Sequence, residues 1–321
     1  MRILVTGGAG YIGSVVTRCL VEEGHDVVVL DDLSTGHREA VDSRAELVVG
    51  DITRPQRVLG GVDAVVHLAA RSQVAESVAY PERYWHGNIT ATMALLEAMR
   101  EAGVKKMVFS STAAVYGKPR GRVITEEHPT APINPYGASK LAIDHMLAAS
   151  AAAHGLGAVS LRYFNAAGAL AELGERHEPE THLIPNLLEA AFTGATAKVF
   201  GTDYPTDDGT AVRDYIHVAD LAQAHLRALE SIEPSRHEVF NLGTGRGHSV
   251  GEVLLAVQHG TGQEVEVEHH PRRAGDPAVL VASPEKARRL LGWLPERGLE
   301  EMIADAAAAR NMQRGAPAAA A

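Results

Sequence analysis

The sequence predicts an α/β protein in which a doubly wound parallel sheet is joined to a smaller mixed α/β cap. Three observations support this prediction. The apolar segment 2–6 is typical of a strand and leads directly into glycines at positions 7, 10 and 13. Strand-like and helix-like segments then alternate up to about residue 181, and the alternation becomes irregular from about residue 182. Regular alternation is typical of a parallel sheet with helices on both faces.

The first half of the chain contains the segments that we expect to build the sheet. Short runs rich in aliphatic and β-branched residues predict strands at 26–30, 46–49, 64–68, 106–111 and 158–163. A helix after the glycines is indicated by the helical spacing of Val15, Val16, Cys19 and Leu20. Longer helices are predicted at 81–102 and 136–154.

The second half mixes shorter elements. We predict helices at 184–192, 218–229, 284–291 and 299–311, strands at 197–200, 238–241 and 264–268, and a polar loop at 203–209. These segments predict a first domain over 1–181, to which 217–241 returns, and an interleaved second domain over 182–314. The small residues of 315–321 predict a flexible tail.

The composition excludes several classes of function. The formal charge of −10 argues against a nucleic-acid surface, and the sequence has no run of Lys or Arg. No apolar stretch reaches the roughly 18 residues of a membrane span. A chain that opens on a strand and contains one cysteine, Cys19, is expected in the cytoplasm, without a leader or a disulfide framework. The histidines are scattered without ligand spacing, so no metal is expected.

The glycine-rich turn predicts a dinucleotide site. Gly7, Gly10 and Gly13, with Tyr11 and Ile12 between them, form a strand-to-helix turn whose backbone N–H groups can receive a pyrophosphate. Such a turn is typical of a Rossmann-type domain, so we expect the first domain to bind NAD. Asp31 ends the second strand, where its carboxylate can accept ribose hydroxyls. Asp31 and Asp32 favour NAD over NADP, although Arg38 leaves NADP open.

Tyr136 and Lys140 predict an acid–base centre. Asn134 can cap a helix that begins at Pro135, which places the phenol and the ammonium on one helical face. A cation beside a phenol favours the phenolate, so we expect Lys140 to lower the pKa of Tyr136. A Tyr with a lowered pKa can act as a general base near neutral pH.

Other candidate site residues follow the predicted strands. Ligands of open parallel sheets bind beyond the carboxyl ends of the strands. The residues expected at this edge include an acid and an aliphatic residue for the adenine, small residues that admit the cofactor, and strand-end hydroxyls: Asp51, Ile52, Leu68, Ala69, Ala70, Ser110 and Thr112. Thr112 is expected to share a substrate hydroxyl with Tyr136.

Together these motifs resemble a known family. The segments GGAGYIG at 7–13, SSTAAVYG at 110–117, YGASK at 136–140 and RYFN at 162–165 are similar to the extended short-chain dehydrogenase/reductase family. The segments DYPTDDGT at 203–210 and VRDYIHV at 212–218 are similar to the nucleotide-sugar 4-epimerases within that family. The resemblance covers residue 1 to about 294.

The resemblance implies an enzyme that inverts C4 of a UDP-hexose through a transient 4-keto intermediate, with tightly held NAD. It implies that Tyr136 and Lys140 are catalytic with Thr112 assisting, and that Asn88 and Tyr163 join the cofactor site. The implied substrate-binding residues are Asn165, His182, Leu183, Phe200, Arg213, Arg273 and Asp276. Arg213 and Arg273 would neutralise the diphosphate; an ion pair between Arg213 and Asp214 is the structural alternative. A homodimer formed by the helices at 81–102 and 136–154 is also implied.

The sequence departs from the family pattern in places. Ser72 and His182 stand where a Lys and an Asn often occur, and Leu280 replaces a frequent Tyr beside the sugar. A smaller residue at 280 leaves UDP-N-acetylglucosamine open as an alternative substrate, and a UDP-pentose is open as well. Two alternatives to the epimerase have a different function. A dehydratase would need acids where this chain has Ala113 and Ala114, and a non-catalytic NAD-sensing protein would not need Tyr136 and Lys140.

Overall fold

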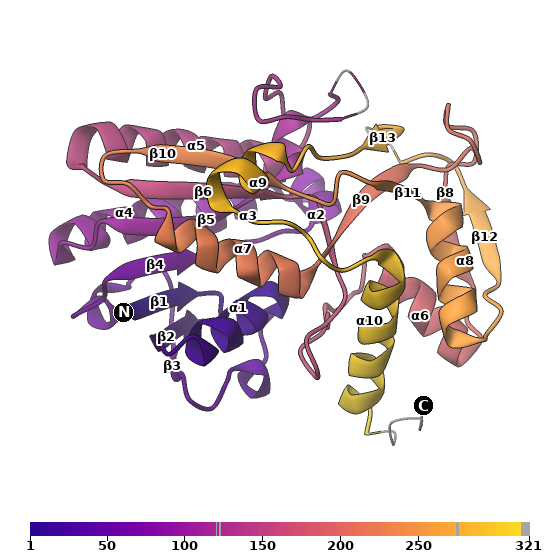
Figure 1. The fold of residues 1–321 in the computed structure, drawn as a ribbon, viewed down its shortest axis with the longest axis horizontal. Coiled ribbons are helices and arrows are strands. Elements are labelled where there is room, and N and C mark those ends of the chain that lie inside the picture. Colours follow the sequence, from indigo (N-terminus) through magenta and orange to yellow (C-terminus); the bar gives the residue numbers. More distant parts are fainter. Residues whose placement is uncertain (120, 122, 274–275, 316–321) are drawn as a thin grey trace.

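The computed structural model describes residues 1–119, 121, 123–273 and 276–315, and shows a sheet-based lobe beside a smaller lobe (Figure 1). Most of the predicted tail, residues 316–321, lies outside the described residues. In the described part of the chain, no helix combines the length and apolar character needed to cross a bilayer.

The larger lobe is built on a seven-stranded sheet, counted over the described residues, in the order β10-β6-β5-β4-β1-β2-β3. Every neighbouring pair in it is parallel. Its strands are β1 (Arg2–Thr6), β2 (Asp26–Asp31), β3 (Glu46–Val49), β4 (Ala64–His67), β5 (Lys106–Thr112), β6 (Gly157–Tyr163) and β10 (His237–Leu242). All residues of β4 and β6 are buried, as expected for strands covered on both faces.

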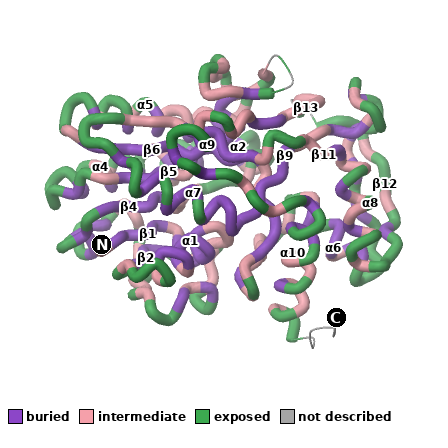
Figure 2. Tube along the Cα trace, viewed as in Figure 1, coloured by how far each residue is buried: buried purple, intermediate pink, exposed green. Residues whose placement is uncertain are grey.

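Helices cover both faces of this sheet. On one face, α1 (Tyr11–Glu22) and α7 (Val218–Glu230) pack over Ile3 and Val5. On the other face, α4 (Ala91–Ala102) and α5 (Pro135–His154) pack over Leu4. Adjacent residues of β1 therefore enter opposite cores, because side chains alternate across a strand. Figure 2 shows the buried residues running along the strands between these two helical layers.

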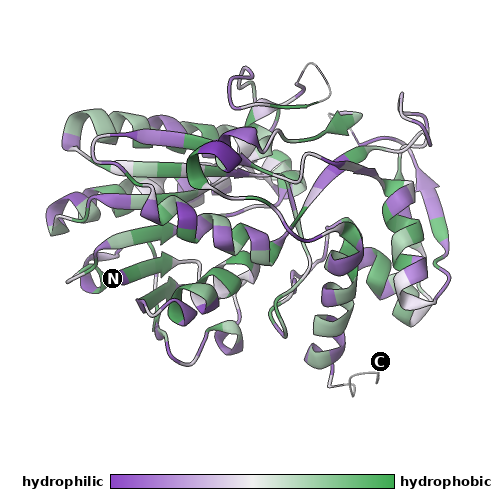
Figure 3. Ribbon diagram, in the orientation of Figure 1, coloured by the Kyte–Doolittle hydropathy of each residue, from purple (hydrophilic) through white to green (hydrophobic). Residues whose placement is uncertain are grey.

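The smaller lobe is mixed α/β. Strand β9 (Val212–His217) pairs with β7 (Asn165–Ala167), β11 (Gly247–Ser249) and β13 (Val279–Leu280), and β8 (Ala197–Phe200) pairs with β12 (Val267–His270). Its helices α6 (Leu183–Thr193), α8 (Val250–Thr261) and α10 (Leu299–Gln313) share a third core, while α9 (Glu285–Leu291) packs against the sheet-based lobe. Hydrophobic and hydrophilic residues alternate along the helices of the protein (Figure 3).

Several predicted elements need correction. The helix expected at 81–102 is α3 (Pro81–Tyr84), a π-helical turn (Trp85–Thr90) and then α4. The strand expected at 264–268 lies at Val267–His270, because its register is set by pairing with β8. Helices α2 (Val74–Ala79) and α8 and the short strands β7, β9, β11 and β13 were not predicted.

Candidate active site

The glycine turn between β1 and α1 is closely packed. Gly7 has φ +73°, and a Cβ there would lie 2.6 Å from the Ala69 nitrogen. A Cβ at Gly13 would lie 2.0 Å from the Gly7 carbonyl oxygen. Only glycine fits both positions, so the turn brings the start of α1 against the end of β4.

The N-terminus of α1 is open to an anion. Gly10 is its N-cap, no side chain caps it, and its first turn contains no acidic residue. Uncapped N–H groups carry the positive end of the helix dipole and favour phosphate. The turn therefore fits a dinucleotide pyrophosphate, with Tyr11 and Ile12 supplying N–H groups at the helix start.

Asp31, at the end of β2, lies directly beside this turn. One of its carboxylate oxygens accepts a hydrogen bond from the Ala9 N–H at 2.9 Å and the other accepts one from the Leu33 N–H at 2.9 Å. Burial raises the pKa of Asp31, and these two hydrogen bonds oppose the rise. Each oxygen keeps acceptor capacity for a ribose hydroxyl.

The remaining cofactor candidates lie at the carboxyl ends of neighbouring strands. Asp51 and Ile52 follow β3, Leu68 to Ala70 follow β4, Ser110 lies near the carboxyl end of β5, and Tyr163 ends β6. Because β3, β2, β1, β4, β5 and β6 are parallel and adjacent, these residues share one edge of the sheet.

Asn88 differs from the other cofactor candidates. It is buried in the π-helical turn, where its amide bonds both backbone groups of Arg71 at 2.8 and 3.0 Å. Its Nδ2 also donates to the Ser139 hydroxyl at 2.9 Å. With its amide occupied by protein, Asn88 fixes the chain after β4 against α5.

Tyr136 and Lys140 lie in the first turns of α5. The Asn134 side chain accepts from the Gly137 N–H at 2.8 Å and caps this helix. Lys140 is only 2% exposed, and its Nζ donates to the Ser110 carbonyl oxygen at 2.8 Å. The Tyr136 ring packs edge-to-face on Tyr84 with 6.4 Å between centroids.

The electrostatics of this pair differ from the expectation. Burial raises the pKa of Tyr136. The hydrogen bond between the Tyr136 and Thr112 hydroxyls opposes this rise. Lys140 was expected to lower that pKa but is directed to Ser110 instead, and burial lowers the pKa of Lys140 to about 7. In this structure Thr112, rather than Lys140, favours the phenolate.

The sequence did not single out His225, which lies behind the site. Its Nδ1 donates to the Leu221 carbonyl oxygen at 2.8 Å, so its Nε2 must accept from the Tyr163 hydroxyl. Burial lowers the pKa of His225 to about 4, which keeps the ring neutral. A single His in α7 has no motif signal, so this contact depends on the tertiary fold.

Four of the substrate candidates lie close together in the smaller lobe. Arg213 in β9 donates to the carbonyl oxygens of Val212 and Pro277, each at 2.9 Å, and lies 3.6 Å from the Asp276 carboxylate. Arg273 lies over the Phe200 ring at 4.1 Å from its centroid. The alternative pair of Arg213 with Asp214 does not form.

Asp214 serves the backbone instead. It is buried and accepts from the N–H groups of Thr244, Gly245 and Ala282. Leu280 lies opposite Arg213 in the β13–β9 pairing.

Asn165 links the two lobes. It lies two residues after the end of β6, begins β7 and pairs with Tyr215 of β9. His182 and Leu183 lie at the start of α6. The His182 ring is directed to carboxylates, with its Nδ1 2.7 Å from Glu180 and 3.6 Å from Glu175.

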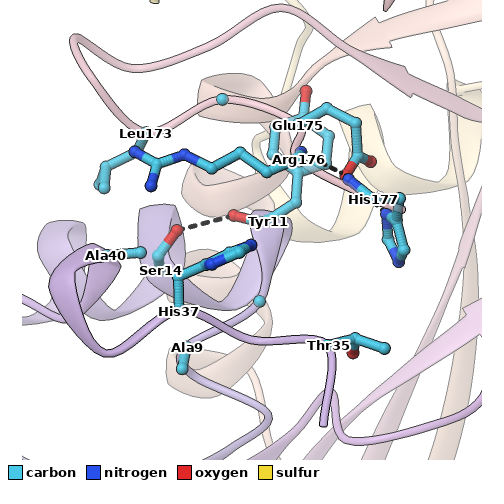
Figure 4. A pocket seen from close by; sticks show the side chains of 12 residues that line it. Ala9, Tyr11, Ser14, Thr35, His37, Ala40, Leu173, Glu175, Arg176 and His177 are labelled. Atoms are coloured by element: carbon cyan, nitrogen blue, oxygen red, sulfur yellow. Dashed lines mark hydrogen bonds and ion pairs between the residues drawn. The ribbon is translucent and has the colours of Figure 1, made fainter. Parts of the chain in front are cut away.

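A pocket adjoins the glycine turn (Figure 4). One side is formed by residues 9–11 and Ser14, and the opposite side by residues 173–177. The Tyr11 hydroxyl donates to the Gly168 carbonyl oxygen at 2.6 Å. The segment between β7 and α6 therefore faces the turn that is predicted to hold the cofactor.

Known proteins resemble this chain over nearly its whole length. It is 54% identical over 312 residues to the UDP-glucose 4-epimerase of Corynebacterium glutamicum, which covers 95% of this chain and 94% of the relative. It is 54% identical over 313 residues to the UDP-glucose 4-epimerase of Streptomyces lividans, with coverage of 95% and 94%.

Solved structures share the fold. The UDP-glucose 4-epimerase of Brucella ovis in complex with NAD has a TM-score of 0.91 and 44% identity, and covers 95% of this chain and 97% of its own. The Bifidobacterium longum enzyme in complex with NAD+ and UDP has a TM-score of 0.93 and 37% identity, with coverage of 98% and 99%. These matches confirm the predicted doubly wound α/β fold.

A family model with the description "NAD dependent epimerase/dehydratase family" matches residues 3–243. This match confirms the predicted cofactor, and the glycine turn with its uncapped helix fits that cofactor. The chain belongs to the NAD dependent epimerase/dehydratase family.

Proposed function

We propose that this chain is an NAD-dependent enzyme that inverts C4 of a UDP-hexose and interconverts UDP-glucose and UDP-galactose. The observation that carries the proposal is the position of Tyr136, Lys140 and Thr112 at the same sheet edge as the glycine turn. The relatives quoted above are named for UDP-glucose, which supports this sugar over an N-acetylated hexose or a pentose.

Tyr136 is the proposed general base. Its oxygen accepts the proton of the sugar 4-hydroxyl as C4 loses its hydride, and it returns that proton when the 4-keto group is reduced. Bound NAD supplies the group that takes the hydride and gives it back, together with a positive ring that favours the phenolate. Inversion requires that the 4-keto sugar present its other face between the two steps.

Thr112 and Lys140 position this proton transfer. The Thr112 hydroxyl hydrogen-bonds Tyr136 and can donate to its phenolate. The Ala114 N–H donates to Thr112 Oγ1 at 3.1 Å, which fixes the orientation of the Thr112 side chain. Lys140 is proposed to bind the nicotinamide ribose through the N–H groups that Ser110 leaves free.

The smaller lobe is proposed to hold the nucleotide. Arg213 and Arg273 present guanidinium groups for the diphosphate, which needs concentrated positive charge in a chain of net charge −10. Leu183 and Phe200 are proposed to contact the uracil, Asp276 a ribose hydroxyl, and Asn165 other polar groups of the nucleotide-sugar. His182, which the resemblance assigns to the substrate, has its Nδ1 directed to Glu180 and Glu175, so it is not part of the proposed substrate site. Firm binding of the nucleotide leaves the hexose free to turn.

The site does not favour a dehydratase. Expulsion of water from the sugar needs an acid beside the catalytic Thr. Ala113 and Ala114 occupy that position in a 3-10 turn (Ala113–Tyr116) and cannot transfer a proton.

A homodimer is part of the proposal. Trp85 of the π-helical turn and Met93 of α4 are exposed. Along α5 the exposed residues include small ones: Ala148, Ala149, Ala152 and Ala153. Exposed apolar surface of this kind favours helix packing between two copies. We propose the cytoplasm as the compartment because the sequence contains a single cysteine.

The proposal is tested with purified protein and separate UDP-sugars. We expect UDP-glucose and UDP-galactose to interconvert without added oxidant or reductant, and the absorbance of bound NADH to rise when a UDP-hexose is added. A protein that retains NAD but converts neither sugar in the panel would contradict the proposal. Faster inversion of UDP-N-acetylglucosamine or a UDP-pentose would replace the proposed sugar.

A further inference from the structure

Two Glu-x-His turns lie in the segment between β7 and α6. In the first, Glu175 Oε1 accepts from the Arg176 N–H at 2.9 Å and lies 2.5 Å from His177 Nδ1. In the second, Glu180 Oε1 accepts from the Thr181 N–H at 2.7 Å and lies 2.7 Å from His182 Nδ1. Each carboxylate thus holds its own turn and also orients an imidazole.

The two turns converge on one point. Glu175 Oε2 lies 3.6 Å from His182 Nδ1, so the two oxygens of Glu175 face the two different imidazoles. The ligand atoms of Glu175, His177 and His182 all lie within 4.8 Å of one another. The Glu175 side chain is only 10% exposed, whereas the His182 side chain is 49% exposed, so the cluster opens to solvent on the His182 side.

We propose that Glu175, His177 and His182 bind one divalent transition-metal ion, with zinc the best fit. Two imidazole nitrogens and a carboxylate are a ligand set that zinc uses. Tetrahedral zinc with bonds of about 2.1 Å needs donor atoms roughly 3.4 Å apart, so modest side-chain rotation closes the site. Glu180, beside the same His182 nitrogen, lies next to the fourth position.

The local charge supports a dication. The carboxylates of Glu175 and Glu180 bring two negative charges to the cluster. The hydrogen bond with Glu175 raises the pKa of His177, and that with Glu180 raises the pKa of His182 against the effect of burial, so a bound metal ion displaces imidazole protons. Arg176 does not neutralise the cluster, because its guanidinium group lies 3.3 Å from the Glu39 carboxylate. An ion of charge +2 balances the two carboxylates while the imidazoles supply neutral ligands.

The position of this cluster indicates a structural role. Glu175 and His177 line the pocket whose other wall is the glycine turn, and Figure 4 shows them across that pocket from Tyr11. His182 immediately precedes α6. A metal here cross-links residues 175–182 and holds them against the cofactor turn. The inference does not depend on the proposed function, because binding is measured without substrate.

The test measures metal binding to the 321-residue chain with its NAD retained. The protein is treated with a chelator, dialysed and titrated with zinc, and the bound metal is counted by mass spectrometry. Cobalt(II) is used in parallel because its visible spectrum reports tetrahedral nitrogen and oxygen ligands. The variants are Glu175→Gln, His177→Ala and His182→Ala, and His259→Ala on the exposed side of α8 is the control.

One zinc per chain, with affinity at least tenfold weaker in the three cluster variants and unchanged in His259→Ala, supports the site. Glu175→Gln is the decisive variant, since Gln keeps the size of Glu and one acceptor oxygen but is a poor zinc ligand. Circular dichroism of each variant checks that it is folded. Binding of less than one zinc per ten chains, or equal binding by all variants, overturns the proposal.

Discussion

The Lys140 ammonium nitrogen donates to the carbonyl oxygen of Ser110 at 2.8 Å, which joins the start of α5 to the carboxyl end of β5. The bond places a cation at 2% exposure, over the Phe109 ring at 4.8 Å from its centroid. This arrangement costs stability, because burial lowers the pKa of Lys140 to about 7.

Replacing Lys140 with Met should therefore stabilise the protein while it abolishes activity. The folded-state pKa of Lys140 lies below its unfolded value of 10.5. Burial of this cation therefore lowers the free energy of unfolding by nearly its maximum amount at pH 7, and the effect vanishes as pH rises toward 10.5. After allowance for the unpaired Ser110 carbonyl, we expect a gain of roughly 1–3 kcal/mol at pH 7. Urea unfolding at pH 7 and pH 9.5 measures it, and a gain that does not shrink at the higher pH would contradict the explanation.

Tyr136→Phe should remove the general base and leave the fold intact. Proton transfer by a positioned side chain contributes about 10²–10⁴-fold to a rate, so we expect kcat to fall by roughly 10³-fold. The Phe ring keeps the contact with Tyr84, so the midpoint of thermal unfolding should change little. Tyr80→Phe, which removes an exposed hydroxyl, is the matched control. Retention of most of the activity would exclude Tyr136 as the base.

Arg213→Ala should weaken substrate binding more than it slows the chemistry. A hydrogen bond to a charged group contributes about 1.5–3 kcal/mol, which corresponds to a rise in KM of roughly 10–100-fold. We expect kcat to change by less than about threefold, because Arg213 is proposed to contact the diphosphate and not the hexose. Arg227→Ala, in an exposed ion pair on α7, should leave KM unchanged. A loss confined to kcat would place Arg213 elsewhere in the reaction.

Two buried histidines should make stability fall in mild acid. Burial lowers the pKa of His67 to about 3 and that of His225 to about 4. These pKa values lie below the unfolded value near 6.5. The contribution of the two neutral imidazoles to the free energy of unfolding is therefore complete above pH 6.5 and is lost as pH falls toward 4. Each should contribute a slope of about 1.4 kcal/mol per pH unit.

His225→Gln should reduce that slope by about one histidine's share between pH 6 and pH 5, even if it lowers stability at pH 7. Denaturant unfolding at each pH provides the measurement. His259→Gln, at an exposed position, should leave the slope unchanged. Equal slopes in the parent protein and His225→Gln would mean that His225 is already protonated in the folded state.

The sheet was largely predictable because its signals are local. The strand, glycine turn and helix over 2–22 follow from residue type and spacing alone, as do β3 and α5. Helix α8 was missed even though Ser249 and Glu252 form a capping box at its start, which is a signal that the sequence contains. The π-helical turn at Trp85–Thr90 has no comparable sequence pattern.

The site was predictable as a set of residues but not as a set of contacts. Motif spacing identified Tyr136, Lys140 and Arg213, yet the partner of Lys140 is a carbonyl of a strand 30 positions away in sequence. The convergence of Glu175 with His182 likewise depends on how one loop folds back. Partners of this kind are fixed by tertiary packing, and the spacing of residues along the chain does not contain them.

The edge strand β10 has a consequence for biosynthesis. It pairs with residues 158–163 of β6, yet it is made of residues 237–242, after β7, α6, β8 and β9 of the smaller lobe. While the ribosome is still adding the intervening residues, β6 has one open row of N–H and C=O groups that can recruit a foreign strand. A nascent chain stopped before residue 237 should thus depend on chaperones, and release from them should coincide with emergence of this last strand.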